Sequence, residues 1–490
     1  MKKNDRVILT ITDHTTEGEG IGHADGFALF VKGAVVGDTA ECVVMKLKKN
    51  YGYARLLKVI TPSPDRVPAP CSAARSCGGC QLQEMNYDAT LRLKTKKVTE
   101  ALRRIGGFKV RQEGESEAEA DSLSVNRCIG MNDPWRYRNK ALVPFAVNRE
   151  NRVVTGFFAA HSHTVIESED CLLTPPEFSA IIRAVKDHVV RFHIPVYNEE
   201  THEGLLRHLL IRKGFSTGEI LISLVLNGER FPHADELVTR LKTLLEPLGL
   251  TLGSLSANVN KTPGNVILSG DTRILYGKPR IEDSIGPIRF GISANSFFQV
   301  NPVTTKQLYE KALEYAGLTG RETVWDLYCG IGSISLFLAQ KAKKVYGVEI
   351  VPQAIEDARE NAQKNSIENA EFFTGKAEEV LPRWVETHPK ETIDVIVTDP
   401  PREGCDPVTL QTMVRLAPSR IVYVSCNPAT LARDLKILSE NGYRIEKVQP
   451  YDQFPWTGHV ETVCCLYHQK KDFISVPYEP KDTDFMQQLK

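Results

Sequence analysis

The chain has 490 residues, of which 42% are hydrophobic and 25% charged, which is typical of a soluble globular protein with about three domains. Its 61 Lys and Arg residues balance 61 Asp and Glu residues, so any surface for nucleic acid must come from local patches of charge. No apolar run approaches the roughly 18 residues of a membrane span, and residues 1–14 lack a signal-peptide core, so we expect a cytoplasmic protein. An odd total of 11 cysteines makes a disulfide framework improbable and favours metal or thiolate chemistry.

Residues 1–60 predict a small all-β module. Short strand-like runs at 7–12, 27–31 and 39–44 are separated by glycine turns, and a five-stranded barrel of the OB type fits them. The glycine-rich pattern from Gly18 to Asp38 resembles the TRAM domain, an RNA-binding barrel. A basic run interleaved with aromatic residues follows, which suits phosphate contacts and base stacking, although a solvated basic hairpin would look the same. The run consists of Lys46, Lys48, Lys49, Tyr51, Tyr53 and Arg55.

A proline-rich linker at 61–70 leads into a region with a predicted metal site. Cys71, Cys77 and Cys80 lie close together on a glycine-containing loop that lets the backbone fold around a metal. We expect Cys171 to be the fourth ligand, with Cys128 as the second choice. Zinc and a 4Fe-4S cluster both accept four thiolates, and the spacing does not separate them.

Residues 61–289 as a whole predict a central α+β domain that carries this site. An acidic stretch at 114–121 is expected to be a loop. A second basic-aromatic run, 134–140, enters a strand and fits a solvated edge as well as an RNA groove. Strands are expected at 141–146, 153–160, 205–212 and 219–226, and helices near 87–105, 177–192 and 234–243.

Residues 290–470 alternate strand and helix, which predicts a doubly wound parallel sheet in a Rossmann-like α/β domain, followed by a tail at 471–490. In such a sheet ligands bind at the carboxyl ends of the strands. A strand ending at Tyr328 is followed by a turn with Gly330 and Gly332, and the next strand ends in Glu349. Glycines let a ligand lie against a helix N-terminus, and the carboxylate can accept ribose hydroxyls. Ser335 replaces the third glycine of a dinucleotide fingerprint, which favours S-adenosyl-L-methionine.

Three further strand ends carry reactive side chains. Asp399 follows a buried strand and is fixed at the ligand edge by two prolines. Cys426 ends the apolar strand 420–425 and precedes an Asn-Pro turn. A lone cysteine of this kind is more often a core residue than a nucleophile. Glu461 opens a later strand, however, and a thiol beside a carboxylate favours nucleophilic and acid-base chemistry.

Five motifs occur in order along the chain: Phe298-Gln299-Val300-Asn301-Pro302, Asp326-Leu327-Tyr328-Cys329-Gly330, Asp399-Pro400-Pro401-Arg402, Ser425-Cys426-Asn427-Pro428 and His459-Val460-Glu461-Thr462-Val463. With them the chain resembles the RNA 5-methyluridine methyltransferase family over nearly its whole length. The barrel and the cysteines make it more similar to the 23S rRNA branch than to the tRNA enzymes, which generally lack both.

The resemblance implies roles for particular residues. Cys426 would be the nucleophile, and Glu461 would remove the C5 proton. The remaining roles are contacts to S-adenosyl-L-methionine by Gln299, Tyr328, Glu349 and Asp399, and ligation of a 4Fe-4S cluster by Cys71, Cys77, Cys80 and Cys171.

The chemistry explains why these residue types are needed. C5 of uracil is a poor nucleophile until a thiolate adds at C6, and a base must then take the C5 proton. Donors near O4 would stabilise the enolate, and Arg402 is a candidate. The target uridine must be flipped or single-stranded to reach a sheet edge. Candidate stacking residues are Phe297, Phe298 and Trp456, and each of the three could equally be a core residue.

Other classes fit less well. A cytosine-5 RNA methyltransferase would place a cysteine directly after its Asp-x-Pro strand end, where Arg402 stands. A radical S-adenosylmethionine enzyme would have more closely spaced cysteines. A tRNA 5-methyluridine methyltransferase is the alternative within the family. A metal-stabilised RNA-binding protein with no turnover is the alternative outside it.

Overall fold

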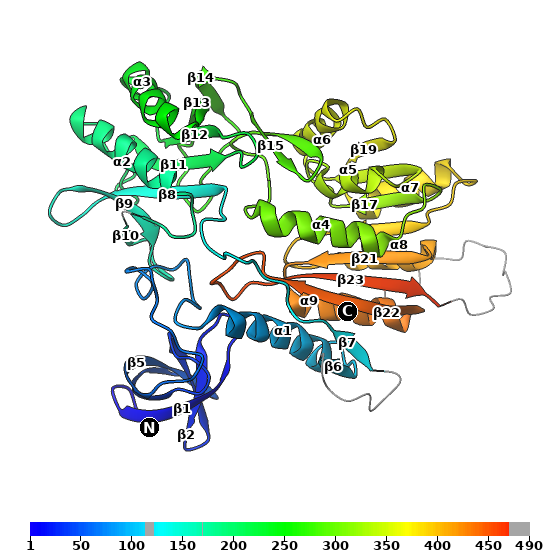
Figure 1. Ribbon diagram of the computed structural model, residues 1–490, viewed down its shortest axis with the longest axis horizontal. Helices are drawn as coiled ribbons and strands as arrows, with labels where there is room; N and C mark the ends of the chain where they lie inside the picture. The colour runs from blue at the N-terminus through cyan, green and yellow to red at the C-terminus, as the bar shows by residue number, and fades with distance from the viewer. Residues whose placement is uncertain (113–121, 169, 470–490) are drawn as a thin grey trace.

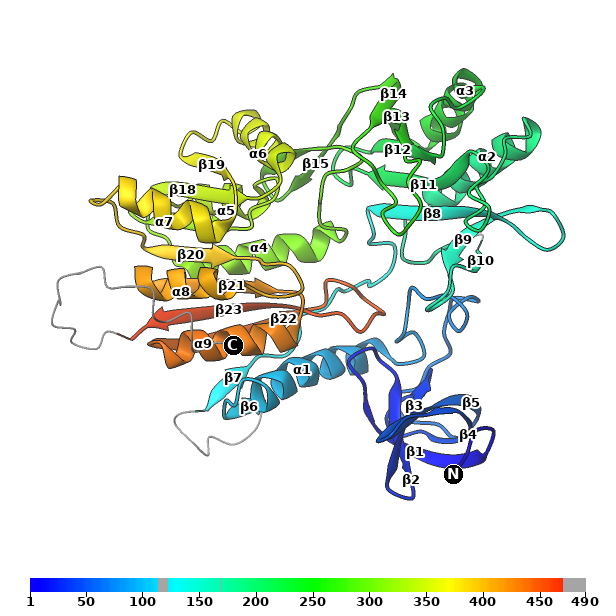
Figure 2. The same ribbon diagram turned by 180° about the vertical axis from the view of Figure 1, so that it is seen from behind.

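The computed structural model describes residues 1–112, 122–168 and 170–469. The predicted tail, 471–490, and the predicted acidic loop, 114–121, lie outside these residues. A small barrel stands at one end of the molecule, below a nine-stranded sheet, and a seven-stranded sheet lies beside the larger one (Figures 1 and 2). No helix in the described ranges has the length and hydropathy of a membrane span.

The first five strands form a closed barrel, as predicted. Alternate residues point inward, so that Leu9, Ile11, Leu29 and Val31 fill its interior. The strands are β1 (Arg6–His14), β2 (Gly20–Ala24), β3 (Phe27–Lys32), β4 (Thr39–Leu47) and β5 (Tyr51–Thr61).

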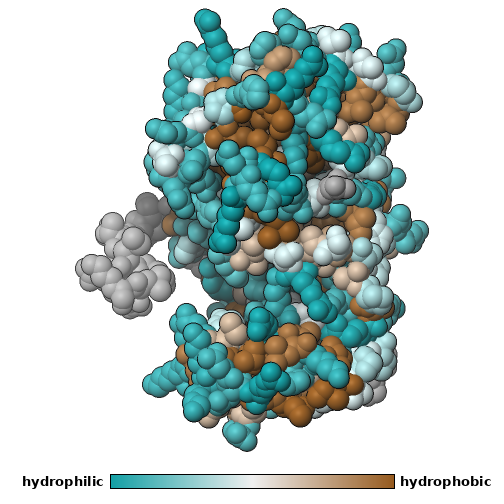
Figure 3. Space-filling view, turned by 90° about the vertical axis from the view of Figure 1, so that its left-hand side faces the viewer, coloured by the Kyte–Doolittle hydropathy of each residue, from teal (hydrophilic) through white to brown (hydrophobic). Residues whose placement is uncertain are grey.

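The outside of the barrel is unusually aromatic and apolar. The rings of Phe30 and Tyr51 stack with centroids 5.1 Å apart, and Tyr53 packs edge-on against Phe30 at 5.8 Å. Figure 3 shows hydrophobic side chains over the lower end of the molecule, where the barrel lies, and Ile8 and Ile60 are among its exposed apolar residues. Clustered, partly exposed rings are expected of a binding surface more than of a solvated face.

The seven-stranded sheet forms the central part of the chain and has its helices on one face. Apolar residues of both helices, such as Ile181 and Leu241, pack on Leu209 and Ile211 of the sheet. The helices are α2 (Pro176–Arg191) and α3 (Ala234–Leu245), the latter continued by η1 (Glu246–Leu248). In spatial order the strands are β10 (Val165–Glu167), β9 (Val153–Phe158), β8 (Lys140–Val147), β11 (Leu206–Lys213), β12 (Glu219–Leu226), β13 (Thr251–Val259) and β14 (Thr272–Gly277).

The nine-stranded sheet has helices on both faces, as a doubly wound fold requires. Five neighbouring strands are parallel, namely β19 (Ala370–Thr374), β18 (Lys344–Glu349), β17 (Thr323–Leu327), β20 (Val395–Thr398) and β21 (Arg420–Ser425). They are followed by β23 (Glu461–His468), β22 (Tyr443–Tyr451), β7 (Leu123–Val125) and β6 (Val110–Gln112). One face carries α4 (Pro302–Ala316), α5 (Ser333–Ala339) and α6 (Pro352–Lys364). The other carries α7 (Ala377–Thr387), α8 (Pro407–Leu416), α9 (Pro428–Glu440) and α1 (Tyr87–Arg104), and a hairpin, β15 (Ile281–Ile285) and β16 (Ile288–Ile292), precedes α4.

Residues far from the catalytic region in sequence thus complete its sheet. Helix α1 packs Val98 and Leu102 into the core beneath the sheet, and β7 pairs with β22 at Val125 and Val448. The sheet therefore takes elements from both sides of the predicted boundary at residue 289. The domain boundaries at 60, 289 and 470 remain predictions.

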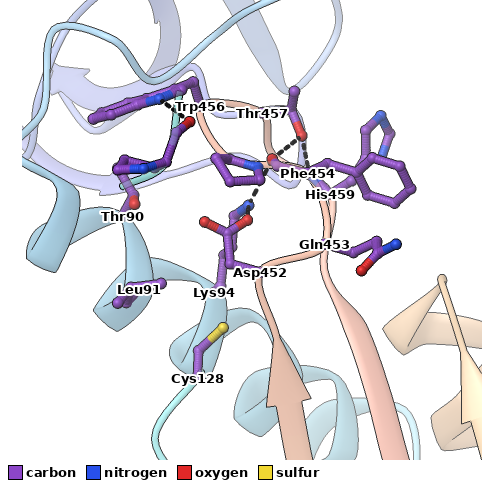
Figure 4. A network of polar contacts seen from close by, with 12 residues as sticks. Thr90, Leu91, Lys94, Cys128, Asp452, Gln453, Phe454, Trp456, Thr457 and His459 are labelled. Carbon is purple, nitrogen blue, oxygen red and sulfur yellow. Dashed lines mark hydrogen bonds and ion pairs between the residues drawn. The ribbon is translucent and has the colours of Figure 1, made fainter. Parts of the chain in front are cut away.

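A buried ion pair fastens α1 to the loop that joins β22 to β23, residues 452–460. Lys94 and Asp452 are both almost fully buried and point toward each other in Figure 4. The Lys94 ammonium also donates to the Phe454 carbonyl oxygen at 3.1 Å. Thr457 closes the loop by donating from its hydroxyl to the same carbonyl at 2.8 Å. Loop 452–460 is therefore held to α1 immediately before the chain enters β23.

Candidate active site

Cys426 and Glu461 meet because of the strand register. β21 and β23 are antiparallel and pair Ser425 with Thr462, so Cys426 directly follows, and Glu461 directly precedes, the last paired residues at one edge of the sheet. Glu461 is also the first of the charged groups that act on the Cys426 thiol. Because β23 runs against the parallel strands, its first residue lies at their carboxyl edge, where ligands bind.

The groups around Cys426 have opposite effects on the pKa of its thiol. Burial, and next the charges of Glu461 and Asp399, raise its pKa to about 11. Arg402 acts the other way, and Cys426 directly precedes the N-cap of α9, whose N-terminus favours a thiolate. Burial, followed by the charge of Asp399, raises the pKa of Glu461 well above its ordinary value, which makes Glu461 a stronger base when ionised.

Arg402 is held beside this pair by its backbone. Its carbonyl oxygen accepts hydrogen bonds from the Asn427 side-chain amide at 3.0 Å and from the Thr430 hydroxyl at 3.2 Å. Asn427 also caps α9, with its side chain accepting from the Ala429 amide at 3.1 Å. The loop after Asp399 and the turn after Cys426 are therefore one hydrogen-bonded unit.

Two buried carboxyl groups near the ends of the parallel strands, Asp399 and Asp326, have raised pKa values. Burial raises the pKa of Asp399 to about 6. Burial also raises the pKa of Asp326 to about 7, although the Ser335 hydroxyl donates to it at 2.5 Å. Asp399 contributes to the raised pKa values of Cys426, Glu461 and Asp326, which places its charge at the centre of the site.

Tyr328 and Glu349 line one cavity of about 410 Å³ at the carboxyl ends of β17 and β18. Tyr328 has φ of +67°, and Gly330 has φ of +54°, so the turn follows a left-handed path that glycine favours. The Glu349 carboxylate accepts from the amides of Gly330 at 3.3 Å and Val351 at 3.0 Å. The cavity has the size of a small-molecule pocket.

Two of the predicted cofactor residues lie outside the lining of this cavity. Gln299 is fixed by Asn139, whose amide donates to its carbonyl oxygen at 2.9 Å, and by Gln453, whose amide donates to its side-chain oxygen at 3.4 Å. Asp399 lies at the reacting edge described above. Gly375, Glu378 and Arg433 also line the cavity, and none of them was among the predicted residues. Gly375 directly follows β19, and the end of a third parallel strand could have indicated it.

The four predicted ligand cysteines come together. Cys71, Cys77, Cys80 and Cys171 all line a cavity of about 240 Å³. Cys128 does not join them, because it is buried against α1, where its amide donates to the Thr95 hydroxyl at 2.9 Å.

The surroundings of the cysteine cavity suit an anionic group. As the side chains stand, no group of three or more His, Cys, Asp or Glu in the described residues is arranged to hold one metal ion. The cavity itself leaves room between the thiols, and a four-iron cluster needs its ligands farther apart than one zinc ion does. Arg138 and Lys140 line the same cavity, and neither forms an ion pair with a described carboxylate. The Arg138 Nε is buried without a described partner, as expected where a negative charge would be bound.

A further cavity of about 430 Å³ opens at Cys426 and reaches the barrel. One wall comes from the barrel loop 13–18 and another from α1. Arg402 and His459 lie at the Cys426 end. Cations and anions both line it: Lys94, Lys96, Lys97, Arg104 and Arg402, and Asp13, Glu17 and Glu100.

Of the three predicted stacking residues, Phe297 is 73% exposed and the other two are packed. Phe298 lies in the core against Phe290, with ring centroids 5.7 Å apart. Trp456 stacks on Trp135 at 4.4 Å, and its carbonyl accepts from the amides of Gln81 and Leu82. Of the two alternatives, stacking on RNA and packing in the core, Phe298 and Trp456 therefore follow the second, because their rings already have partners in the protein.

Comparisons with known proteins identify the family of the chain. Residues 280–470 match the family model described as tRNA (Uracil-5-)-methyltransferase, and residues 3–57 match the TRAM domain. An uncharacterized RNA methyltransferase of Halalkalibacterium halodurans is 48% identical over 466 residues, covering 95% of this chain and 98% of the relative. Another, from Clostridium tetani, is 45% identical over 473 residues, covering 96% and 98%.

Among solved structures, the tRNA (uracil-54, C5)-methyltransferase of Pyrococcus abyssi in complex with S-adenosyl-L-homocysteine superposes with a TM-score of 0.72. It is 28% identical, and the match covers 94% of this chain and 100% of that one. The chain belongs to the S-adenosyl-L-methionine-dependent RNA uracil-5-methyltransferase family, with a TRAM domain at its N-terminal end.

Proposed function

We propose that this protein methylates C5 of a uridine in RNA through a covalent adduct between Cys426 and C6 of the uracil. The observation that carries the proposal is that Cys426 and Glu461 flank the last pair of β21 and β23, with Cys426 lining a groove that reaches the TRAM barrel. A non-catalytic RNA-binding protein would need neither the neighbouring thiol and carboxylate nor a cofactor pocket beside them.

The reaction begins when the Cys426 sulfur bonds to C6 and the electrons of the C5–C6 double bond move to the enolate at C4–O4. The Arg402 guanidinium, next to Cys426, is positioned to balance negative charge on the adduct. C5 then attacks a methyl group, which S-adenosyl-L-methionine supplies when bound. Glu461 takes the C5 proton, the C5–C6 double bond reforms, and the C6–S bond breaks to return the thiolate.

We assign the methyl donor to the cavity with Tyr328 and Glu349, and retain Gln299 and Asp399 as its further contacts. The Glu349 carboxylate, fixed by two backbone amides, suits ribose hydroxyls. Asp399 is one residue beyond β20 and electrostatically coupled to both reacting groups, so it can sit between the donor and the uracil.

We further propose that Cys71, Cys77, Cys80 and Cys171 hold a 4Fe-4S cluster. The shared cavity and the unpaired cations Arg138 and Lys140 support it. No step of the methyl transfer needs an electron, so we assign the cluster a structural role beside the RNA surface. Iron and sulfide analysis of protein purified without oxygen tests this, and a colourless zinc protein would contradict it.

The substrate we propose is 23S rRNA, on the resemblance to that branch. A tRNA substrate is the second candidate, because the solved structure with TM-score 0.72 is a tRNA (uracil-54, C5)-methyltransferase. Incubating the protein with labelled methyl donor and either transcribed 23S rRNA or tRNA, followed by nucleoside mass spectrometry, decides between them.

The same assay tests the mechanism. Cys426→Ser should abolish 5-methyluridine formation. Glu461→Gln should accumulate a denaturant-stable protein–RNA adduct, because the C5 proton stays in place. RNA binding without 5-methyluridine from either RNA would favour the non-catalytic alternative.

A further inference from the structure

Loop 13–18, which comprises the end of β1 and most of the turn that joins it to β2, forms part of the wall around Cys426. It lines the same 430 Å³ cavity as Cys426, Arg402 and His459. A barrel that served only to tether RNA would have no reason to reach the reacting thiol.

Helix α1 fixes this loop to loop 452–460. The Lys97 ammonium donates to the Thr16 carbonyl oxygen at 2.9 Å and to the Gly458 carbonyl oxygen at 2.8 Å, which bridges the two loops. Lys96 forms an ion pair with Asp13 at 2.8 Å. One helix therefore sets the position of the barrel loop relative to the residues that lead into Glu461.

The two loops also touch through their backbones. A Cβ at Gly458 would lie 2.9 Å from the Thr16 carbonyl oxygen and 3.2 Å from the Glu17 carbonyl carbon, so only glycine allows this approach. Gly458 is next to His459 and three residues before Glu461. The contact places Glu17 at the rim of the groove, close to the reaction centre.

Glu17 has the chemistry of a base-reading residue. Its side chain is exposed, and its carboxylate forms no hydrogen bond with another described residue. Burial chiefly lowers the pKa values of Lys97 and His459, and the Glu17 charge offsets this in both, so the carboxylate lies near them. A carboxylate repels RNA phosphates but accepts hydrogen bonds from amino groups of bases, as it does from cytosine N4.

We propose that loop 13–18 completes the target pocket and that Glu17 reads a nucleotide adjacent to the target uridine, favouring a base with an exocyclic amino group over uracil. Uracil presents two carbonyl oxygens beside its single N–H, and these would face the carboxylate. The inference rests on the proposed function, since it assumes that the target uridine reaches Cys426.

The test uses the full chain and the RNA fragment that it methylates, synthesised with 5-fluorouridine at the target position and each of the four bases on either side. The rate of covalent adduct formation is measured with the methyl donor present. Wild-type protein should prefer an amino-bearing base over uracil by about tenfold at one of the two flanking positions.

Glu17→Gln should reduce this preference to about threefold or less, because the amide can also donate to uracil oxygens. Gly458→Ala should reduce the same preference, because the added Cβ would displace loop 13–18. The matched control is Asp25→Asn, which changes an exposed carboxylate in the β2–β3 turn of the same barrel, outside the groove, and should keep the wild-type preference. Thermal unfolding of all four proteins identifies any variant that is misfolded.

An unchanged flanking-base preference in Glu17→Gln, or no preference in the wild type, overturns the inference. In that case Cys426→Ser still separates the two proposals. If it forms no adduct, only the reading role of Glu17 is lost. If it forms adduct and product at the wild-type rate, the proposed function is lost as well.

Discussion

Replacing Lys94 by Met should strongly destabilise the protein, because it leaves Asp452 as a buried charge without a partner. Both side chains are at most 1% exposed, and Asp452 also has one oxygen without a hydrogen bond among the described residues. Breaking a buried pair from one side typically costs about 3–5 kcal/mol. With a urea m-value of ~3 kcal/mol/M, a loss of ~4 kcal/mol lowers the unfolding midpoint by ~1.3 M.

The assay is urea unfolding followed by the fluorescence of the four tryptophans, two of which, Trp135 and Trp456, stack on each other. The double variant Lys94→Met/Asp452→Asn should regain ~2 kcal/mol, since the uncompensated charge is gone. Lys96→Met, two residues along the same helix, is the control. Its pair with Asp13 is 44% and 38% exposed, so its loss should cost under ~1 kcal/mol. Equal midpoints for Lys94→Met and Lys96→Met would refute the reasoning.

Three further predictions concern the active site. Because the pKa of Cys426 is raised to about 11, its alkylation by iodoacetamide, followed by peptide mass spectrometry, should speed up about tenfold per unit between pH 7 and 10, and a plateau below pH 8 would contradict this. The buried Asp326 has its pKa raised to about 7 from 3.8, so the folded state holds this proton more tightly than the unfolded state, and stability falls as pH rises from about 4 to about 7, by at most ~4 kcal/mol. Asp326→Asn should remove that part of the pH dependence in urea unfolding, and parallel curves for variant and wild type would count against the assignment. Phe297→Ala should raise KM for RNA several-fold with an unchanged melting temperature, because the ring is 73% exposed; a lowered melting temperature with normal KM would indicate a packing role instead.

The sequence predicted elements whose pattern is local. The barrel strands, the glycine turn after Tyr328 and the strand ending at Cys426 all follow from alternation and turn residues, and the structure confirms them as elements. The meeting of Cys426 with Glu461 was harder to foresee. It depends on β23 running antiparallel beside β21, and strand direction leaves no mark in a short apolar run.

Long-range packing explains what the sequence analysis overlooked. Three-residue strands such as β6 and β7 are too short to show a period, and nothing local indicates that they extend a sheet formed by residues beyond 320. Phe298 and Trp456 are a further example. The sequence around an aromatic residue does not show whether its ring faces solvent or packs on another ring.

The ion pair between Lys94 and Asp452 joins residues 358 positions apart, and this has a consequence for biogenesis. At a synthesis rate of about 5–20 residues per second, α1 leaves the ribosome roughly 20–70 s before Asp452 is made. Throughout that interval the apolar side of α1, with Leu91, Val98 and Leu102, has no final place to pack. A nascent chain interrupted before residue 452 would therefore expose the apolar face of α1. The chain should depend most on chaperones between the synthesis of α1 and that of residue 452.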